Sequence, residues 1–102
     1  HFTRAKGFDT FCPLGPFIQT EFTNNPELNI KAFVNGELKQ DGNSRDMIYS
    51  IGEILEFVTS IMTLLPGDVV MTGTPEGVSQ VKPGDEIKIE IETLGTLINS
   101  VE

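Results

Sequence analysis

The chain has almost none of the residues that sulfur and imidazole chemistry require. Its one cysteine, Cys12, excludes an intrachain disulfide, and its one histidine is His1, at the terminus. With no internal histidine, a Ser-His-Asp triad cannot form, and Cys12, although a possible nucleophile, has no histidine to activate it. We therefore expect Cys12 to be a small packed residue. We expect His1 to be a trimmed or mobile end, not a ligand.

Basic residues are also few. Seven Lys and Arg stand against fifteen Asp and Glu, which gives a net charge of −8 and a pI near 4.5. There is no basic patch to neutralise phosphates, so we expect neither nucleic acid nor an anionic membrane surface as a partner. A small anionic substrate is still compatible with this composition, because a few local cations can dominate one pocket.

Long apolar runs are missing as well. No stretch is long enough to cross a membrane, and no signal peptide is visible. Together with the lone cysteine, this predicts a cytoplasmic protein. The 102 residues suffice for at most one domain with a modest core. The chain does not begin with Met, so we expect a processed, trimmed or partial chain.

Alternating apolar residues predict a β-rich fold. Residues 28–34 alternate as a strand, and the Asn35-Gly36 dipeptide that follows is the strongest short hairpin signal, since a type I′ turn needs positive φ at both centres. Residues 37–40 would form the return strand, and Asp41-Gly42 would turn again.

Two Pro-Gly-Asp turns are each expected to lead into a strand. The first, at residues 66–68, precedes the apolar residues 69–72, which read as a buried strand. The second, at 83–85, precedes 86–92, where isoleucines alternate with charged residues and should face inward. A last strand is expected over 96–101.

One long amphipathic helix is expected over about residues 45–64, capped by Asn43 or Ser44 and stopped by Pro66-Gly67. Its apolar stripe should pack on the sheet as core, the alternative being a partner-binding groove. Residues 1–27 are aromatic and rich in Pro and Gly, so we expect an irregular but packed segment, with a turn at 24–26. The fold class predicted is α+β, mainly β.

The segment Met71 to Val78 is the main candidate for a binding loop. Two glycines and a proline follow an apolar run, and the hydroxyls of Thr72 and Thr74 lie at the break. Such a loop lets backbone N–H groups approach an anion, although a turn with nothing bound is the simpler alternative. Lys6, next to Gly7, could reach a carboxylate as a point charge, or could be a surface lysine. Glu90 and Glu92 have a metal-ligand spacing, but on the outward face of a strand.

Taken together, these segments resemble the C-terminal part of the fumarylacetoacetate hydrolase family, of the acylpyruvate hydrolase or 2-hydroxyhepta-2,4-diene-1,7-dioate isomerase type. The resemblance covers almost the whole chain. It is carried, in the family's order, by residues 5–16 (AKGFDTFCPLGP), 34–37 (VNGE), 40–43 (QDGN), 46–48 (DMI), 62–70 (MTLLPGDVV) and 72–78 (TGTPEGV).

The resemblance implies a mixed β-roll and an enzyme that depends on Mg²⁺ or Mn²⁺. Such enzymes hydrolyse, decarboxylate or isomerise 2-oxo, 2-hydroxy-dienoic and acylpyruvate-type acids. Their metal chelates the 2-oxo-carboxylate and stabilises an enolate. By the same resemblance, Lys6 would be catalytic and contact the substrate, and Thr10 would support the site. Thr74 and the backbone of Gly73 would hold the substrate carboxylate. A homodimer is expected, as in many members.

The family's metal ligands are a Glu-x-Glu pair and a downstream Asp, which all precede the lysine-glycine segment. We therefore expect residues 1–102 to be the C-terminal portion of a single catalytic domain, with no metal ligands of its own and the ligands upstream. The alternative is a non-catalytic binding or assembly module that keeps the fold without the metal triad.

Overall fold

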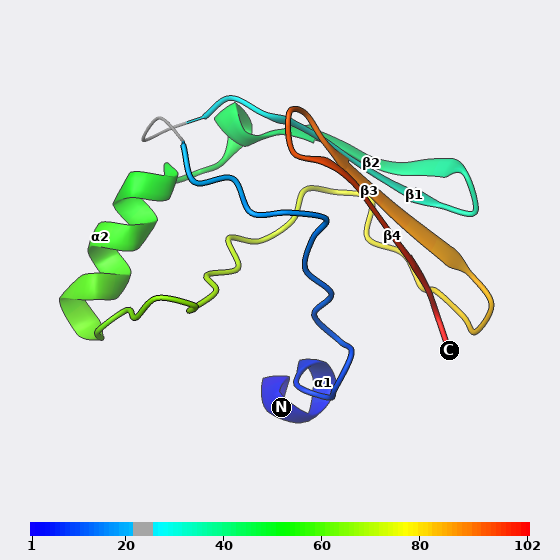
Figure 1. The fold of residues 1–102 in the computed structure, drawn as a ribbon, viewed down its shortest axis with the longest axis horizontal. Helices are drawn as coiled ribbons and strands as arrows, with labels where there is room; N and C mark the ends of the chain where they lie inside the picture. Colours follow the sequence, from blue (N-terminus) through cyan, green and yellow to red (C-terminus); the bar gives the residue numbers. More distant parts are fainter. Residues whose placement is uncertain (22–25) are drawn as a thin grey trace.

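A four-stranded antiparallel sheet is the largest element of the fold (Figure 1). The computed structural model describes residues 1–21 and 26–102. Its strands follow the spatial order β2-β1-β3-β4. Their bounds are β1 (Asn29–Val34), β2 (Glu37–Asn43), β3 (Glu86–Ile91) and β4 (Gly95–Ser100). All four overlap strands that were predicted from the sequence, and with the helices they make an α+β fold.

The β1–β2 hairpin forms as predicted. Asn35 and Gly36 have φ angles of 51° and 80°, the positive values that the two centres of a type I′ turn require. The turn predicted at Asp41-Gly42 is wrong, because β2 continues through it to Asn43. There Asp41 pairs with Lys31 of β1, so the ladder satisfies backbone groups that a turn would have had to satisfy locally.

A β-bulge interrupts the pairing of β1 with β2. Ala32 pairs with Gln40 and the next residue, Phe33, pairs with Leu38, so Lys39 has no direct partner on β1. A bulge bends a strand and re-aims the side chains beside it. This one lies next to Gln40, the residue through which the strand contacts the candidate loop.

The predicted helix over 45–64 is too long at its N-terminal end. A 3₁₀ turn, η1 (Ser44–Asp46), comes first, and the α-helix is α2 (Ile51–Ile61). Ser50 and Glu53 form a capping box, in which Glu53 N–H donates to Ser50 Oγ and Ser50 N–H donates to Glu53 Oε2. This cap satisfies free N–H groups and starts the helix at Ile51, with extended backbone at Met47 before it.

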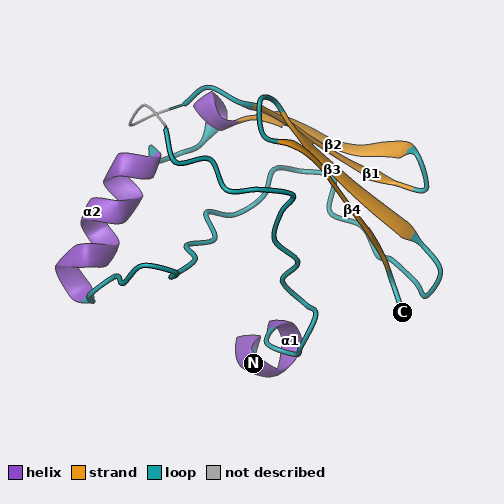
Figure 2. Cartoon of the chain, in the orientation of Figure 1, coloured by secondary structure: helices purple, strands orange, loops and turns teal. Residues whose placement is uncertain are grey.

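α2 does not pack on the sheet as predicted. It lies to one side, beyond η1 (Figure 2), and none of its residues is buried. Among the elements that the structure describes, close packing is found between the strands. The apolar stripe of α2 is therefore at most half-buried, although its composition is that of a core face.

The predicted strand at residues 69–72 is also wrong. Those residues are loop, and Val69 and Met71 are 56% and 75% exposed. An apolar run becomes a strand only where a neighbouring strand pairs with its backbone, and no described strand does so here.

The two Pro-Gly-Asp turns adopt the same local structure, as their shared sequence suggested. The aspartate carboxylates accept a hydrogen bond from the backbone N–H three residues earlier: Asp68 from Leu65 at 2.8 Å, and Asp85 from Lys82 at 2.9 Å. Both central glycines have φ above 90°. Only the second turn leads into a strand, β3.

The N-terminal segment contains one short helix, α1 (Phe2–Lys6), which had not been predicted. The rest up to residue 21 is irregular, as expected, but it is not packed. Phe2 is 80% exposed, Phe8 and Phe11 stack edge to face with both rings partly in solvent, and Cys12 is exposed. The turn predicted at 24–26 falls mostly on residues 24 and 25, which lie outside the described residues.

No hydrophobic side chain in residues 1–21 or 26–102 is buried. The isoleucines of β3 that were expected to face inward are only partly covered. The buried polar residue is Asp85, at 7% exposure. Across the described parts of the chain, the helices are too short or too polar for a membrane span.

Candidate functional site

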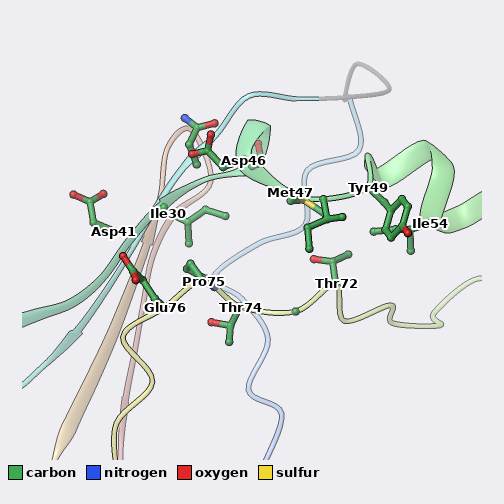
Figure 3. Close-up of a pocket in the computed structure, with 15 residues that line it drawn as sticks. Ile30, Asp41, Asp46, Met47, Tyr49, Ile54, Thr72, Thr74, Pro75 and Glu76 are labelled. Atoms are coloured by element: carbon green, nitrogen blue, oxygen red, sulfur yellow. The ribbon is translucent and has the colours of Figure 1, made fainter.

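An open cavity of about 610 Å³ lies where the end of the β1–β2 hairpin meets the loop after residue 71 (Figure 3). β1 and β2 contribute one wall, through Ile30, Asp41 and Gly42. A second wall is formed by residues 43, 44 and 46–49 together with Ile54 of α2, and residues 72–76 form the third. Gly73 and Thr74, both predicted to bind substrate, therefore line the cavity.

Gln40 of β2 holds this loop. Its side-chain Nε2 donates to Thr74 Oγ1 at 2.8 Å, to the carbonyl oxygen of Pro75 at 2.9 Å and, more weakly, to that of Glu76 at 3.3 Å. The two backbone carbonyls can only accept, so the amide must present its nitrogen to the loop. One glutamine side chain thus sets the position of three consecutive loop residues.

These contacts define which hydrogen bonds Thr74 can still make. A threonine hydroxyl has one proton to donate and two lone pairs to accept with. Gln40 occupies a lone pair of Thr74 Oγ1, so the hydroxyl proton is left to donate to another group. Beside it, Gly73 has φ of 101° with no atom near the position of a Cβ, so the backbone there is open to close approach. Both features suit a carboxylate oxygen.

Two glycines let the loop approach β2 so closely. A Cβ on Gly77 would collide with the carbonyl oxygen of Lys39, and Gly77 also has φ of 98°. A Cβ on Gly42 would lie 3.2 Å from Pro75 Cγ. A glycine inside a strand often marks the close approach of another backbone, and Gly42 does so here.

The cavity walls carry the carboxylates of Asp41, Asp46 and Glu76. They are not grouped: within residues 1–21 and 26–102 no three His, Cys, Asp or Glu side chains come together as a metal site. The described residues therefore do not by themselves fit a divalent cation. The Glu90-x-Glu92 pair is engaged elsewhere, Glu90 with Lys88 at 2.8 Å and Glu92 with Asn29.

Lys6 and Thr10 lie away from this cavity. Lys6 ends α1, with its Nζ 5.6 Å from the ring centre of Phe2, and α1 is well separated from the sheet (Figure 1). Thr10 has φ of 68°, an unusual backbone for a β-branched residue. The structure thus brings Gly73 and Thr74 together but does not join them to Lys6 and Thr10. The roles of all four remain predictions.

Gln40 is the residue that sequence reasoning missed. It was read only as the end of a return strand and as part of a family motif. No local signal in the sequence indicated its role, because its contacts with residues 74–76 join positions more than thirty residues apart.

The described residues thus form an α+β fold with an open cavity of small-molecule size, lined on one side by a hydroxyl-bearing, glycine-rich loop. The chain belongs to the fumarylacetoacetate hydrolase family: residues 1–102 match the family model described as fumarylacetoacetate (FAA) hydrolase C-terminal. This confirms the resemblance inferred from the motifs.

Solved structures agree with this assignment. The chain superposes with a TM-score of 0.91 on the 2-hydroxyhepta-2,4-diene-1,7-dioate isomerase of Mycobacterium marinum, with 47% identity over 98% of this chain and 39% of that one. It superposes with a TM-score of 0.85 on the maleylpyruvate hydrolase of Sphingobium sp. SYK-6 in complex with manganese(II) ion and pyruvate, with 43% identity over 91% of this chain and 36% of that one.

A curated relative extends the range of activities. The chain is 44% identical to the 4-hydroxyphenylacetate degradation bifunctional isomerase/decarboxylase of Salmonella dublin, over 96% of this chain and 23% of the relative. The chain thus spans less than half the length of each of these proteins. The family members named here are enzymes: isomerases, a hydrolase and a decarboxylase.

Proposed function

We propose that this chain is the C-terminal portion of the catalytic domain of a divalent-metal-dependent enzyme. Its substrates would be 2-oxo, 2-hydroxy-dienoic or acylpyruvate-type acids. The reaction would be hydrolysis of a C–C bond, isomerisation or decarboxylation. These are the activities named for its relatives, and all three begin from an acid that carries an oxygen function next to its carboxylate.

One observation carries the proposal. Thr74 lines the cavity, and its hydroxyl oxygen accepts a hydrogen bond from Gln40, so the hydroxyl proton is free to donate. The open backbone of Gly73 lies next to it. A hydroxyl donor beside accessible backbone is suited to one end of a carboxylate. In this proposal Thr74 and Gly73 bind the substrate carboxylate and set its orientation.

The metal would be held by residues that precede His1, because the described residues lack a ligand cluster. Mg²⁺ or Mn²⁺ suits oxygen ligands, and the manganese and pyruvate bound to the Sphingobium relative support this choice. When bound, the ion would supply Lewis-acid stabilisation of negative charge on the substrate. The part of this chain is to bind and orient the acid next to it.

Lys6 is proposed to contact the substrate where negative charge develops, with Thr10 supporting its position. That role requires the segment of residues 2–10 to lie against the cavity in the whole protein. Its exposed aromatic side chains, such as Phe2 and Phe8, supply apolar surface for such packing. We also propose that the whole protein is a cytoplasmic homodimer and that its sheet is completed into a β-roll that covers α2.

The test uses the whole protein, purified without metal. We expect turnover of an acylpyruvate or a 2-hydroxy-dienoic acid when Mg²⁺ or Mn²⁺ is added, and loss of turnover with EDTA. Thr74→Ala should raise KM about tenfold or more, since a charge-assisted hydrogen bond is lost. Thr96→Ala on β4, an exposed threonine away from this cavity, is the control. Equal kinetics for the two variants would contradict the role of Thr74.

A non-catalytic binding or assembly module is the second candidate. The absence of a metal cluster from the described residues and the many exposed apolar side chains favour it. A whole protein that binds neither metal nor a 2-oxo acid such as pyruvate, yet unfolds cooperatively, would select this candidate over the enzyme.

A further inference from the structure

The contacts between β2 and the Gly73–Gly77 loop point to a role for Gln40. We propose that Gln40 is a positioning residue, which acts through Thr74 to orient the hydroxyl that binds the substrate carboxylate. This inference rests on the proposed function and deepens it. It concerns how the loop of this site is held, not the reacting atoms.

The loop lies against β2. β2 is an edge strand, since the order is β2-β1-β3-β4. Three successive contacts join its second half to the loop: Lys39 with Gly77, the Gln40 side chain with residues 74–76, and Gly42 with Pro75. The loop therefore rests against β2, and β2 in turn fixes the loop.

The bulge at Lys39 makes this arrangement specific. Lys39 has no partner on β1, and its carbonyl oxygen lies against Gly77. The ladder resumes at Gln40, opposite Ala32, so this residue is anchored by the sheet at the point where its side chain leaves for the loop. A side chain anchored in a sheet has less freedom to lose when it binds than one on a loop.

The amide group of Gln40 suits this task better than a charged or hydroxyl group. Its Nε2 offers two protons to three acceptors, with the two shortest distances to Thr74 Oγ1 and to the Pro75 carbonyl, at 2.8 and 2.9 Å. Donation to Thr74 Oγ1 excludes the orientation in which the threonine proton points back at β2. The proton is then directed toward a group that arrives from the cavity.

A double-mutant cycle in the whole protein tests this role. Gln40→Ala should raise KM for the 2-oxo acid about tenfold with kcat within about threefold, because carboxylate binding acts on ground and transition states alike. In the Thr74→Ala background, the same Gln40→Ala change should have little further effect on KM. Gln80→Ala, an exposed glutamine in the loop after residue 77, is the matched control.

Gln40→Met keeps about the length of the side chain and removes the donor without adding a charge, so it is the variant to use if Gln40→Ala fails to fold. The same rise in KM, again absent without Thr74, supports the proposal. A rise that persists undiminished in the Thr74→Ala background, or an unchanged KM, overturns it.

A crystal structure of the Gln40 variant separates this inference from the proposed function. If the whole protein turns over no 2-oxo acid but Thr74 Oγ1 shifts by about 1 Å or more in the variant, the function fails while the positioning role stands. An unmoved Thr74 Oγ1 overturns the positioning role whatever the activity.

Discussion

Asn35 and Asp85, fifty residues apart in the chain, are joined by a hydrogen bond of 2.9 Å from Asn35 Nδ2 to Asp85 Oδ1. Asn35 Oδ1 in turn accepts from the backbone N–H of Glu86 at 2.9 Å. The Asn35 side chain, in the first hairpin turn, therefore connects the start of β3 to the end of β1. The same asparagine provides the turn and the connection between the two halves of the sheet.

This pair predicts a pH dependence. The hydrogen bond from Asn35, then the backbone N–H and the charge of Lys82, lower the pKa of Asp85 below its ordinary value of 3.8. Because the pKa is lowered in the folded state, the stabilisation is present above the ordinary value and is lost as pH falls through the folded-state value. Asp85→Asn in the whole protein should lower Tm at pH 7. The difference in Tm between the unchanged protein and the variant should then disappear on acidification below about pH 4. A constant difference would contradict this reading.

Gly77→Ala should destabilise the whole protein by about 2–4 kcal/mol, because it combines a strained φ with a collision against the carbonyl of Lys39. Gly67→Ala is the matched control: its φ of 94° is similar, but nothing lies near its Cβ position. It should cost only about 1 kcal/mol. Urea unfolding of both variants measures the difference, and equal values would show that the loop does not rest on β2.

Ser50→Ala should destabilise α2 by about 1 kcal/mol, since Ser50 provides the N-cap of the capping box with Glu53. Ser60, in the last turns of the same helix, donates only to the carbonyl of Phe57. Ser60→Ala should be neutral or slightly stabilising, because alanine is the better helix former. Urea unfolding of the two variants checks this, and a larger loss for Ser60→Ala would contradict the assigned helix start.

Lys6→Ala should lower kcat of the whole protein by about 10²–10³ with little change in Tm, if Lys6 contacts developing charge. The side chain is exposed in this structure, so its removal should leave folding intact. Arg4→Ala, in the same short helix, tests whether loss of a positive charge alone matters. Steady-state kinetics should show the large effect for Lys6 only.

The 102-residue chain on its own should self-associate and bind a hydrophobic dye. The structure leaves large apolar side chains exposed in the N-terminal segment, in α2 and in the loops that flank it, including Ile48 at 92%. Exposed apolar surface of this extent drives association. Analytical ultracentrifugation with dye fluorescence is the measurement, and a monomer without dye binding would show that these faces are covered in solution.

The sheet could be predicted from sequence because its signals are local. The Asn35-Gly36 turn and the alternating isoleucines of β3 each specify structure within a few residues. The same locality explains the failures. The dipeptide Asp41-Gly42 has the composition of a turn, but its pairing with β1 keeps it in a strand. The apolar residues 69–72 have the composition of a strand, but no described strand pairs with them.

The site was predicted in part, for the same reason. Gly73 and Thr74 stand in a loop whose composition suggests ligand binding, and both line the cavity. Gln40 could not be assigned a role, because its contacts with residues 74–76 join positions more than thirty residues apart. The distance of Lys6 from the cavity depends on packing that single-sequence patterns do not report.

The strand order also has a consequence for the time course of synthesis. β1 pairs on one side with β2, its immediate successor, and on the other with β3, which emerges more than fifty residues later. At about 5–20 residues per second, the hairpin waits several seconds on the ribosome with one edge of β1 unpaired. During that interval the Asn35 side chain has no Asp85 to bind, and an open β1 edge is the surface most exposed to mispairing with another nascent chain.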